Sequence, residues 1–209
     1  GVRVTAGGIV VTAGIVTASN GIDATDDQRN TRVGENAGNS FSGTTATDNT
    51  LLGYDAGTAI TTGDYNTIIG TYAADALTTG SYNVAVGNAA LSAQTTADNN
   101  TAVGTGALNA NTTGTSNSAL GRSTLNVNTT GATNTAIGGN VLLANTTGSS
   151  NTGLGYAALA ANTTASYNTG LGYAALYDNT TGADNTAIGR DALANNTTAS
   201  DNTAVGSGS

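Results

Sequence analysis

Carboxylates are the main side chains in this sequence that could take part in acid–base chemistry. The chain has 13 Asp and Glu residues but no His, Cys or Lys. Most arrangements of a nucleophile and its base therefore cannot be built. The carboxylates form no recurring pair suited to acid–base catalysis. We expect no enzymatic activity, no catalytic residue and no cofactor.

An acidic cluster near the start of the chain could attract Ca²⁺. It consists of Asp23, Asp26, Asp27 and Glu35. The spacing of these residues matches no EF-hand loop, whose ligands recur at fixed alternate positions. We expect a solvated acidic linker here and no metal site.

Asn-Thr-Thr triplets recur along the chain and could be modified chemically. The first residue of each triplet fits the acceptor pattern for N-glycosylation. These candidate glycosylation sites are Asn111, Asn128, Asn145, Asn162, Asn179 and Asn196. In a host with the glycosylation machinery, they would carry a ladder of glycans along one edge. The alternative, which we favour, is an unmodified ladder of turns.

Tyrosines also recur in register with one another. Tyr156 and Tyr173 share one repeat position, and Tyr65 and Tyr82 share another. Stacked surface aromatics could bind glycans, although plain packing at corners is the interpretation we prefer.

Adjacent threonines suggest a further possibility, ice binding, because regular threonine arrays are typical of ice-binding surfaces. The pairs run from Thr61 and Thr62 to Thr197 and Thr198. In extended backbone, only one member of an adjacent pair can point outward. The pairs therefore do not encode a flat face with two threonine columns.

Composition excludes other function classes. The net charge of −8 would repel a nucleic-acid backbone. No apolar run approaches the ~20 residues that span a bilayer, so no membrane insertion is expected. The first residues lack the basic and long apolar segments of a signal peptide, and the sequence begins as if cut from a longer chain.

A 17-residue repeat positions all of these groups. Its first residue is an asparagine, and the unit reads N-T-[AG]-[VIL]-G-x-x-A-L-x-x-N-T-T-[GA]-x-x. Ten full units run from Asn30 to Asp201, the first carrying two extra residues, and a partial unit follows. The marking asparagines are Asn30, Asn49, Asn66, Asn83, Asn100, Asn117, Asn134, Asn151, Asn168, Asn185 and Asn202. A strict period indicates a stack in which each unit contacts its neighbours.

The columns of the repeat predict a β-solenoid. Positions one to four form a short strand with Thr and Val on one face and Asn and Ala on the other. Position four is always Val, Ile or Leu, and position nine is Leu from Leu91 to Leu193. We expect these two columns to form the core. Glycine at position five predicts a corner with positive φ or a close backbone approach. Gly or Ala at position fifteen marks a second corner, and the Ala-Leu segment is either a strand or one helical turn.

Two large apolar side chains per unit make a thin core. Burying one contributes only ~1.5–3 kcal/mol, whereas ordering each residue costs about 1–2 kcal/mol. We therefore expect a parallel homotrimer, with the small residues of position three, notably Gly153 and Gly170, close to another chain. A monomeric solenoid stays an alternative. Residues 1–29 form a separate segment of short strands and the acidic linker, and 30–209 form the repeat domain.

The segment GYAALYDNTTGADNTAIG resembles the NTAIG-type repeats of bacteriophage tail fibres, especially those of marine phages and cyanophages. It is more distantly similar to the heads of YadA-like trimeric autotransporter adhesins. The resemblance covers 30–206 well and implies a trimeric, adhesive fibre in a virion or at a cell surface. Its partners would be further copies of the chain and host-surface glycans. Alternatives are a self-assembling, glycosylated extracellular filament and, less favoured, an ice-binding protein.

Overall fold

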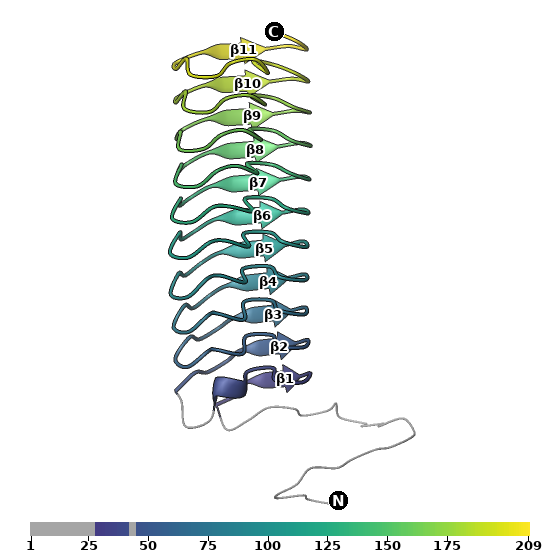
Figure 1. Cartoon of the computed structure of the whole chain (residues 1–209), viewed down its shortest axis with the longest axis vertical. Helices are drawn as coiled ribbons and strands as arrows, with labels where there is room; N and C mark the ends of the chain where they lie inside the picture. The colour runs from purple at the N-terminus through teal and green to yellow at the C-terminus, as the bar shows by residue number, and fades with distance from the viewer. Residues whose placement is uncertain (1–27, 42–44) are drawn as a thin grey trace, which may run out of the picture.

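The protein is a straight stack of coils (Figure 1). The computed structural model describes residues 28–41 and 45–209. Each coil contributes one short strand, and the strands form a single parallel sheet of eleven in sequence order. The all-β solenoid expected from the repeat is confirmed. The strands are β1 (Thr31–Val33), β2 (Thr50–Leu52), β3 (Thr67–Ile69), β4 (Val84–Val86), β5 (Thr101–Val103), β6 (Ser118–Leu120), β7 (Thr135–Ile137), β8 (Thr152–Leu154), β9 (Thr169–Leu171), β10 (Thr186–Ile188) and β11 (Thr203–Val205).

The strands pair so that equivalent positions of the repeat lie above one another. Thr67 pairs with Thr50 on one side and with Val84 on the other. The longer first unit keeps the same register, since Thr31 pairs with Thr50. Its coil contains the 3-10 helix η1 (Asn39–Phe41). Of the N-terminal segment expected at 1–29, only Gln28 and Arg29 lie among the described residues.

The interior differs from the expected core in one column. Position nine is inside, as predicted, and Leu108, Leu142 and Leu176 are fully buried. The prediction for position four is wrong, because most of its side chains are 38–69% exposed. Position three is buried instead. Ala102, Ala119, Ala136, Gly153, Gly170 and Ala187, expected beside another chain or in a crowded interior, lie in that interior.

The asparagine at position one explains this difference. Side chains alternate across a strand, so positions one and three share a face and position four takes the other. Asn66 is buried, its Oδ1 accepts a hydrogen bond from the backbone N–H of Asn83, and its Nδ2 donates to the carbonyl oxygen of Gly80. The same pattern recurs in nearly every coil. The amide thus fixes which face of the strand points inward.

Glycine at position five turns the chain at the end of each strand. The φ angles of this column lie between +123° and +144°. A Cβ on Gly104 would also lie 2.5 Å from the carbonyl oxygen of Gly121. Both expectations for the column, positive φ and close approach, are therefore confirmed. Position fifteen follows a bend but lacks a left-handed φ, as at Gly114.

The Ala-Leu segment is neither a strand nor a helical turn of α type. It is a run of turns in which positions seven and nine adopt left-handed φ, as in Tyr72 at +55° and Leu91 at +55°. Position seven donates its N–H to the coil before, and position nine donates to the coil after. For example, Tyr72 donates to Tyr54 and Leu91 donates to Ala107. This side of the solenoid is thus also hydrogen-bonded along the axis.

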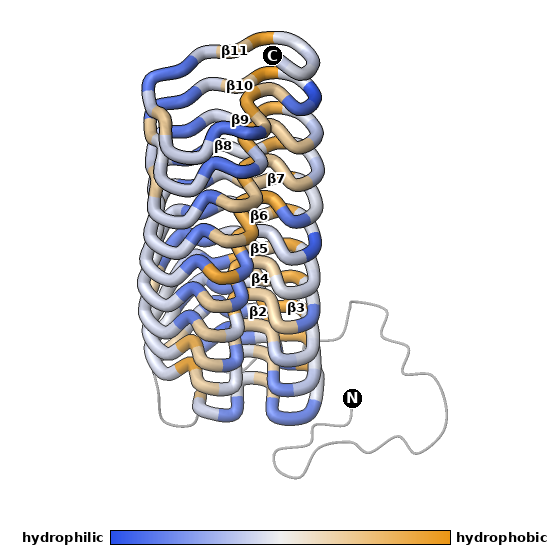
Figure 2. The backbone as a smooth tube through the Cα atoms, turned by 45° about the horizontal axis from the view of Figure 1, so that its top comes forward, coloured by the Kyte–Doolittle hydropathy of each residue, from blue (hydrophilic) through white to orange (hydrophobic). Residues whose placement is uncertain are grey.

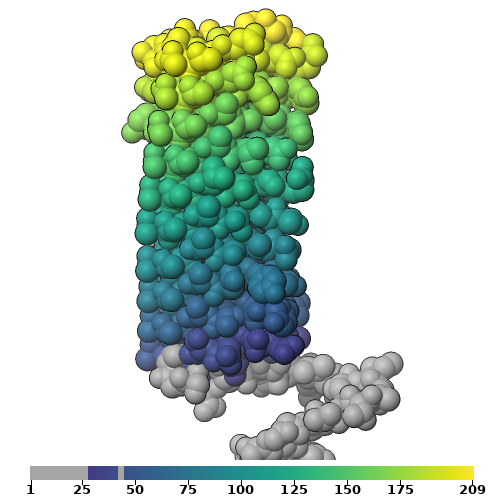
Figure 3. Space-filling model, viewed as in Figure 1, coloured from purple at the N-terminus to yellow at the C-terminus, as the bar shows by residue number. Residues whose placement is uncertain are grey.

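Hydrophobic and hydrophilic residues form columns that run the length of the stack (Figure 2). The space-filling view shows regular rows of atoms from the first coil to the last (Figure 3). Every surface feature that the repeat encodes is consequently repeated along the rod.

Candidate functional site

The outer sheet face, which we define as positions two and four of the strands, repeats along all eleven strands. Position two is threonine in most strands, as in Thr101 and Thr135. Position four is aliphatic throughout, and Leu120 is 48% exposed. The half-buried members of this column are Ile69, Val86 and Val103. The aliphatic column is Val33, Leu52, Ile69, Val86, Val103, Leu120, Ile137, Leu154, Leu171, Ile188 and Val205. A continuous apolar stripe of this kind is uncommon on an isolated soluble protein.

The two threonines of each adjacent pair differ in exposure, as expected for neighbouring residues whose side chains point in different directions. The first threonine is partly buried, and its hydroxyl donates to the next coil, as Thr129 Oγ1 does to the carbonyl oxygen of Thr146 at 3.0 Å. The second threonine is exposed, as at Thr130 and Thr147. The pairs therefore present one outward column, and the threonines of the outer sheet face form a separate one.

The sequon asparagines lie inside the solenoid. Asn128 and Asn145 are fully buried. The Nδ2 of Asn145 donates to Asn128 Oδ1 at 2.8 Å and to the carbonyl oxygen of Gly148 at 2.9 Å. Asn111, Asn162 and Asn179 are equally buried, and Asn196 is partly exposed. A glycan would have to replace a hydrogen on this atom, so the folded geometry favours the unmodified ladder.

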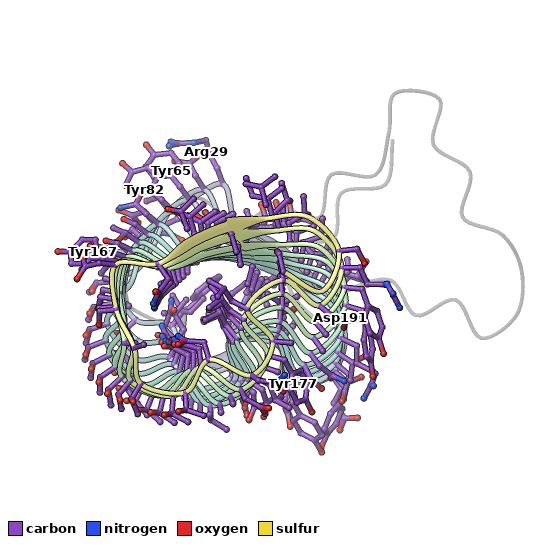
Figure 4. All side chains as sticks on the ribbon, turned by 90° about the horizontal axis from the view of Figure 1, so that it is seen from above. Arg29, Tyr65, Tyr82, Tyr167, Tyr177 and Asp191 are labelled. Carbon is purple, nitrogen blue, oxygen red and sulfur yellow. The ribbon has the colours of Figure 1, made fainter. Side chains whose placement is uncertain are left out.

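Tyrosines stack where the repeat brings them into register. The rings of Tyr156 and Tyr173 are stacked, 5.7 Å apart between centroids, and those of Tyr65 and Tyr82 are 5.1 Å apart. Seen along the axis, Tyr65 and Tyr82 lie on one side of the rod, whereas Tyr177 and Asp191 lie on the opposite side (Figure 4). The two stacked pairs thus belong to different surfaces.

One of these pairs borders a pocket, which we call the tyrosine pocket. Its volume is about 360 Å³, and it spans the coils from β7 to β10. Its walls are formed by tyrosines and polar side chains, and Ala157, Ala160, Ala174 and Ala194 line it between them. The wall residues used below are Asn140, Tyr156, Tyr173, Tyr177, Asp178 and Asp191.

The charged groups of the rod are sparse. In the tyrosine pocket, Asp191 lies 3.5 Å from the guanidinium of Arg190, whereas no basic side chain of the described residues lies within 4.0 Å of Asp178. At the first coil, Arg29 pairs with Asp48, and its hydrogen bond lowers the pKa of the Asp48 carboxyl. Both ion pairs are exposed, so they contribute little to stability.

Among residues 28–41 and 45–209, no three acidic side chains cluster as metal ligands would. Of the acidic cluster considered above, Asp23, Asp26 and Asp27 lie outside these residues. Within the same residues, no helix is long and apolar enough to cross a membrane.

Comparison with known proteins identifies no matching family model, no similar curated protein and no similar solved structure.

Two surface features escaped the sequence interpretation. Hydrophobicity alone places the outer aliphatic column in the core, whereas its spacing from the asparagine of position one places it on the opposite face of the strand. The tyrosine pocket needs residues from positions six, seven, ten and eleven of several coils. The alignment of the units alone does not place Tyr177 and Asp178 beside Tyr156 and Tyr173. Their proximity can be seen only when the path of the backbone through the Ala-Leu segment is known.

Proposed function

We propose that this chain is a non-catalytic shaft segment of a fibre, such as a bacteriophage tail fibre or a related extracellular appendage, and that it works as a parallel homotrimer. The observation that carries the proposal is the combination of an unbroken axial stack with the exposed aliphatic column of the outer sheet face.

The stack suits a shaft because its coils are bonded along the axis on every side. The sheet supplies backbone hydrogen bonds, as from Thr101 to Asn117 at 2.8 Å. The buried asparagines add side-chain hydrogen bonds in the same direction. In such a solenoid, each repeat contacts only its neighbours, so length grows with repeat number without a change in cross-section.

The outer sheet face supports association. Full burial of a Val or Leu side chain contributes ~1.5–3 kcal/mol, so half-exposed side chains leave a useful part of that energy for an interface. Position four repeats along all eleven strands. Three parallel copies facing a common axis would cover all three stripes at once, and a closed cyclic arrangement leaves none exposed.

Sedimentation equilibrium at micromolar concentration tests the proposal. The expected mass is three times the chain mass of 20.2 kDa. Replacing Leu120 and Leu154 by Lys should give smaller species that keep the far-ultraviolet circular dichroism of the unmodified chain. Replacing the exposed Thr130 and Thr147 by Lys is the matched control and should leave the mass unchanged. A folded monomer would refute the trimer, and a mass that grows steadily with concentration would favour the end-to-end filament.

A second candidate, ice binding, is favoured by one observation. The outer sheet face alternates threonine and aliphatic columns that are two positions apart, which is ~6.6–6.8 Å along a strand, and successive strands are ~4.8 Å apart. Such an array presents methyl groups and hydroxyls at regular spacing. In the view along the axis, the side chains from Arg29 to Tyr167 that precede the asparagine of position one lie along an arc (Figure 4). The stack therefore twists gradually about its axis.

The two candidates make opposite demands on the same face. A trimer covers it, whereas ice binding needs it free. Thermal hysteresis measured beside the sedimentation mass separates them. Hysteresis from a monomer that disappears in the Leu120→Lys and Leu154→Lys variant would support ice binding. Its absence at millimolar concentration would exclude that function.

A further inference from the structure

We infer that the tyrosine pocket is a saccharide-binding site that takes a neutral or amino sugar unit. This inference deepens the adhesive part of the proposed function and rests on it only for the biological source of the glycan. The binding chemistry itself follows from the residues of the pocket.

The pocket combines a small apolar floor with many hydrogen-bonding groups. Ala157 and Ala174 are nearly buried and occupy position seven, where other coils carry larger side chains such as Tyr72. A gap is therefore left between the tyrosines of position six and Tyr177 of position ten. The methyl groups can contact the C–H face of a pyranose ring, as apolar linings of small-molecule sites do.

The walls provide donors and acceptors in the density that a polyhydroxylated ligand needs. Tyr156 and Tyr173 both line the pocket and lie one above the other, with their ring faces turned toward each other. The hydroxyl of Tyr156 accepts a hydrogen bond of 3.3 Å from Asn140 Nδ2. Tyr177 borders the pocket from position ten of the coil that contains Tyr173. Phenols and amides can each donate and accept, which matches the dual character of sugar hydroxyls.

The carboxylates set the charge of the ligand. Asp178 and Asp191 both line the pocket, and only Asp191 lies near a basic group, Arg190, whose side chain is largely exposed. Carboxylates accept strong hydrogen bonds from hydroxyl and ammonium groups and repel other carboxylates. The site should therefore prefer amino sugars to neutral sugars and should reject uronic or sialic acids.

A second tyrosine pair provides an internal control. Tyr65 and Tyr82 stack at 5.1 Å, yet they lie on the side of the rod away from Tyr177 (Figure 4) and do not line the tyrosine pocket. If stacked tyrosines alone bound sugars, both pairs would do so. If the pocket binds them, only Tyr156 and Tyr173 will matter.

Titration calorimetry with three defined tetrasaccharides tests the site on the full chain. The probes are tetraglucosamine, its fully N-acetylated form and tetragalacturonate. We expect binding in the order given, with no heat from tetragalacturonate. Replacing Tyr156 and Tyr173 by Ala should weaken tetraglucosamine binding by at least about tenfold, a change of 1.4 kcal/mol. The Asp178→Asn variant should bind tetraglucosamine more weakly than the unmodified chain does, while its affinity for the N-acetylated form should be unchanged.

Three results would overturn the inference: no binding of any probe at millimolar concentration, equal binding of all three, or an equal loss in the Tyr65→Ala and Tyr82→Ala variant. The sedimentation mass of each variant is measured in the same samples. Because the pocket lies away from the outer sheet face, a change in mass reports on the proposed trimer, and a change in heat at constant mass reports on the pocket.

Discussion

Two regions of this solenoid fill the same cross-section in different ways. In the apolar coils, Asn49 to Tyr82, position twelve holds Ile60 and Leu77, position three holds Leu51 and Ile68, and position nine is small. In the asparagine coils, Asn100 to Asp201, position nine is leucine, position twelve is asparagine, and position three is alanine or glycine. Interiors are close-packed, so a large residue at one position requires a small one at another.

Glycine contacts show this exchange directly. A Cβ on Gly57, at position nine, would lie 2.9 Å from both Ile60 Cδ1 and Leu51 Cδ2. In the asparagine coils the crowding moves to position three, since a Cβ on Gly153 would lie 2.4 Å from Val141 Cγ1. The backbone is thus conserved between the regions while the interior side chains are exchanged as a set.

Gln94 joins the two regions. In the ladder of position twelve, each asparagine donates to the Oδ1 of the coil before, so the first one, Asn111, needs an acceptor beneath it. The Oε1 of Gln94 accepts from Asn111 at 3.0 Å and from Asn100 at 2.9 Å, and its Nε2 donates to the carbonyl oxygen of Ala97. A leucine in this place would leave the ladder without its first acceptor.

The largest expected effect concerns what the two regions share. Gly70→Ala and Gly138→Ala place a Cβ 2.5 and 2.6 Å from a carbonyl oxygen of the next coil, at a φ that only glycine adopts readily. Each should lower the free energy of unfolding by more than about 3 kcal/mol, and by similar amounts. Urea denaturation followed by circular dichroism measures this. Gly106→Ala, at an ordinary left-handed φ of 65°, is the control and should cost about 1–2 kcal/mol.

The next effect tests the exchange of interior side chains. Asn145→Leu puts the residue of an apolar coil into an asparagine coil, beside Leu142. It removes the acceptor for Asn162 and overpacks the interior, each of which costs about 1–3 kcal/mol. Adding Leu142→Ala should recover only the part of the free energy of unfolding that is lost through overpacking.

Urea denaturation again provides the measurement, with Asn195→Leu as the surface control that should change stability by less than about 0.5 kcal/mol. If Asn145→Leu alone were neutral, the two regions would not be distinct solutions of one packing problem.

A smaller effect is expected at the junction. Gln94→Leu keeps an apolar contact with the coil below but removes the acceptor for Asn111 and Asn100. The free energy of unfolding should fall by about 1–3 kcal/mol. Local opening should be detected first as faster amide exchange in the coil that contains Asn111. Equal exchange rates in the variant and the unmodified chain would show that the ladder needs no terminal acceptor.

The smallest effect lies at the first coil. Because Arg29 lowers the pKa of Asp48, the ion pair stabilises the fold above the ordinary carboxyl pKa of 3.8 and ceases to do so as the pH falls through the lowered value. The pair is exposed, so only a slight difference in melting temperature between the chain and Asp48→Asn is expected at pH 7. The difference should vanish once the pH lies below the lowered pKa of Asp48. A difference that grows on acidification would contradict this assignment.

Much of this fold could be predicted from the period, because a 17-residue repeat with one aliphatic–glycine step leaves few arrangements besides stacked coils. The glycine corner followed from the residue type. Hydrophobicity alone places the position-four column inside, and only the hydrogen bonding of Asn66 and its equivalents shows that this column faces outward. Leu91 and the other leucines of position nine adopt a left-handed φ, but no glycine marks this conformation in the sequence. The path of the Ala-Leu segment, and with it the tyrosine pocket, could therefore not be predicted.

The proposed parallel trimer is tested most directly by cross-linking at the outer sheet face. The chain contains no cysteine, so single cysteines can be placed at Leu52 or Ile188, near opposite ends of the stack, and at Thr147 as the control. A bismaleimide that spans about 10 Å, the spacing of packed sheets, then joins equivalent residues of neighbouring copies. The trimer predicts rapid cross-linking at both Leu52→Cys and Ile188→Cys and none at Thr147→Cys. Failure at both outer-face positions would contradict it.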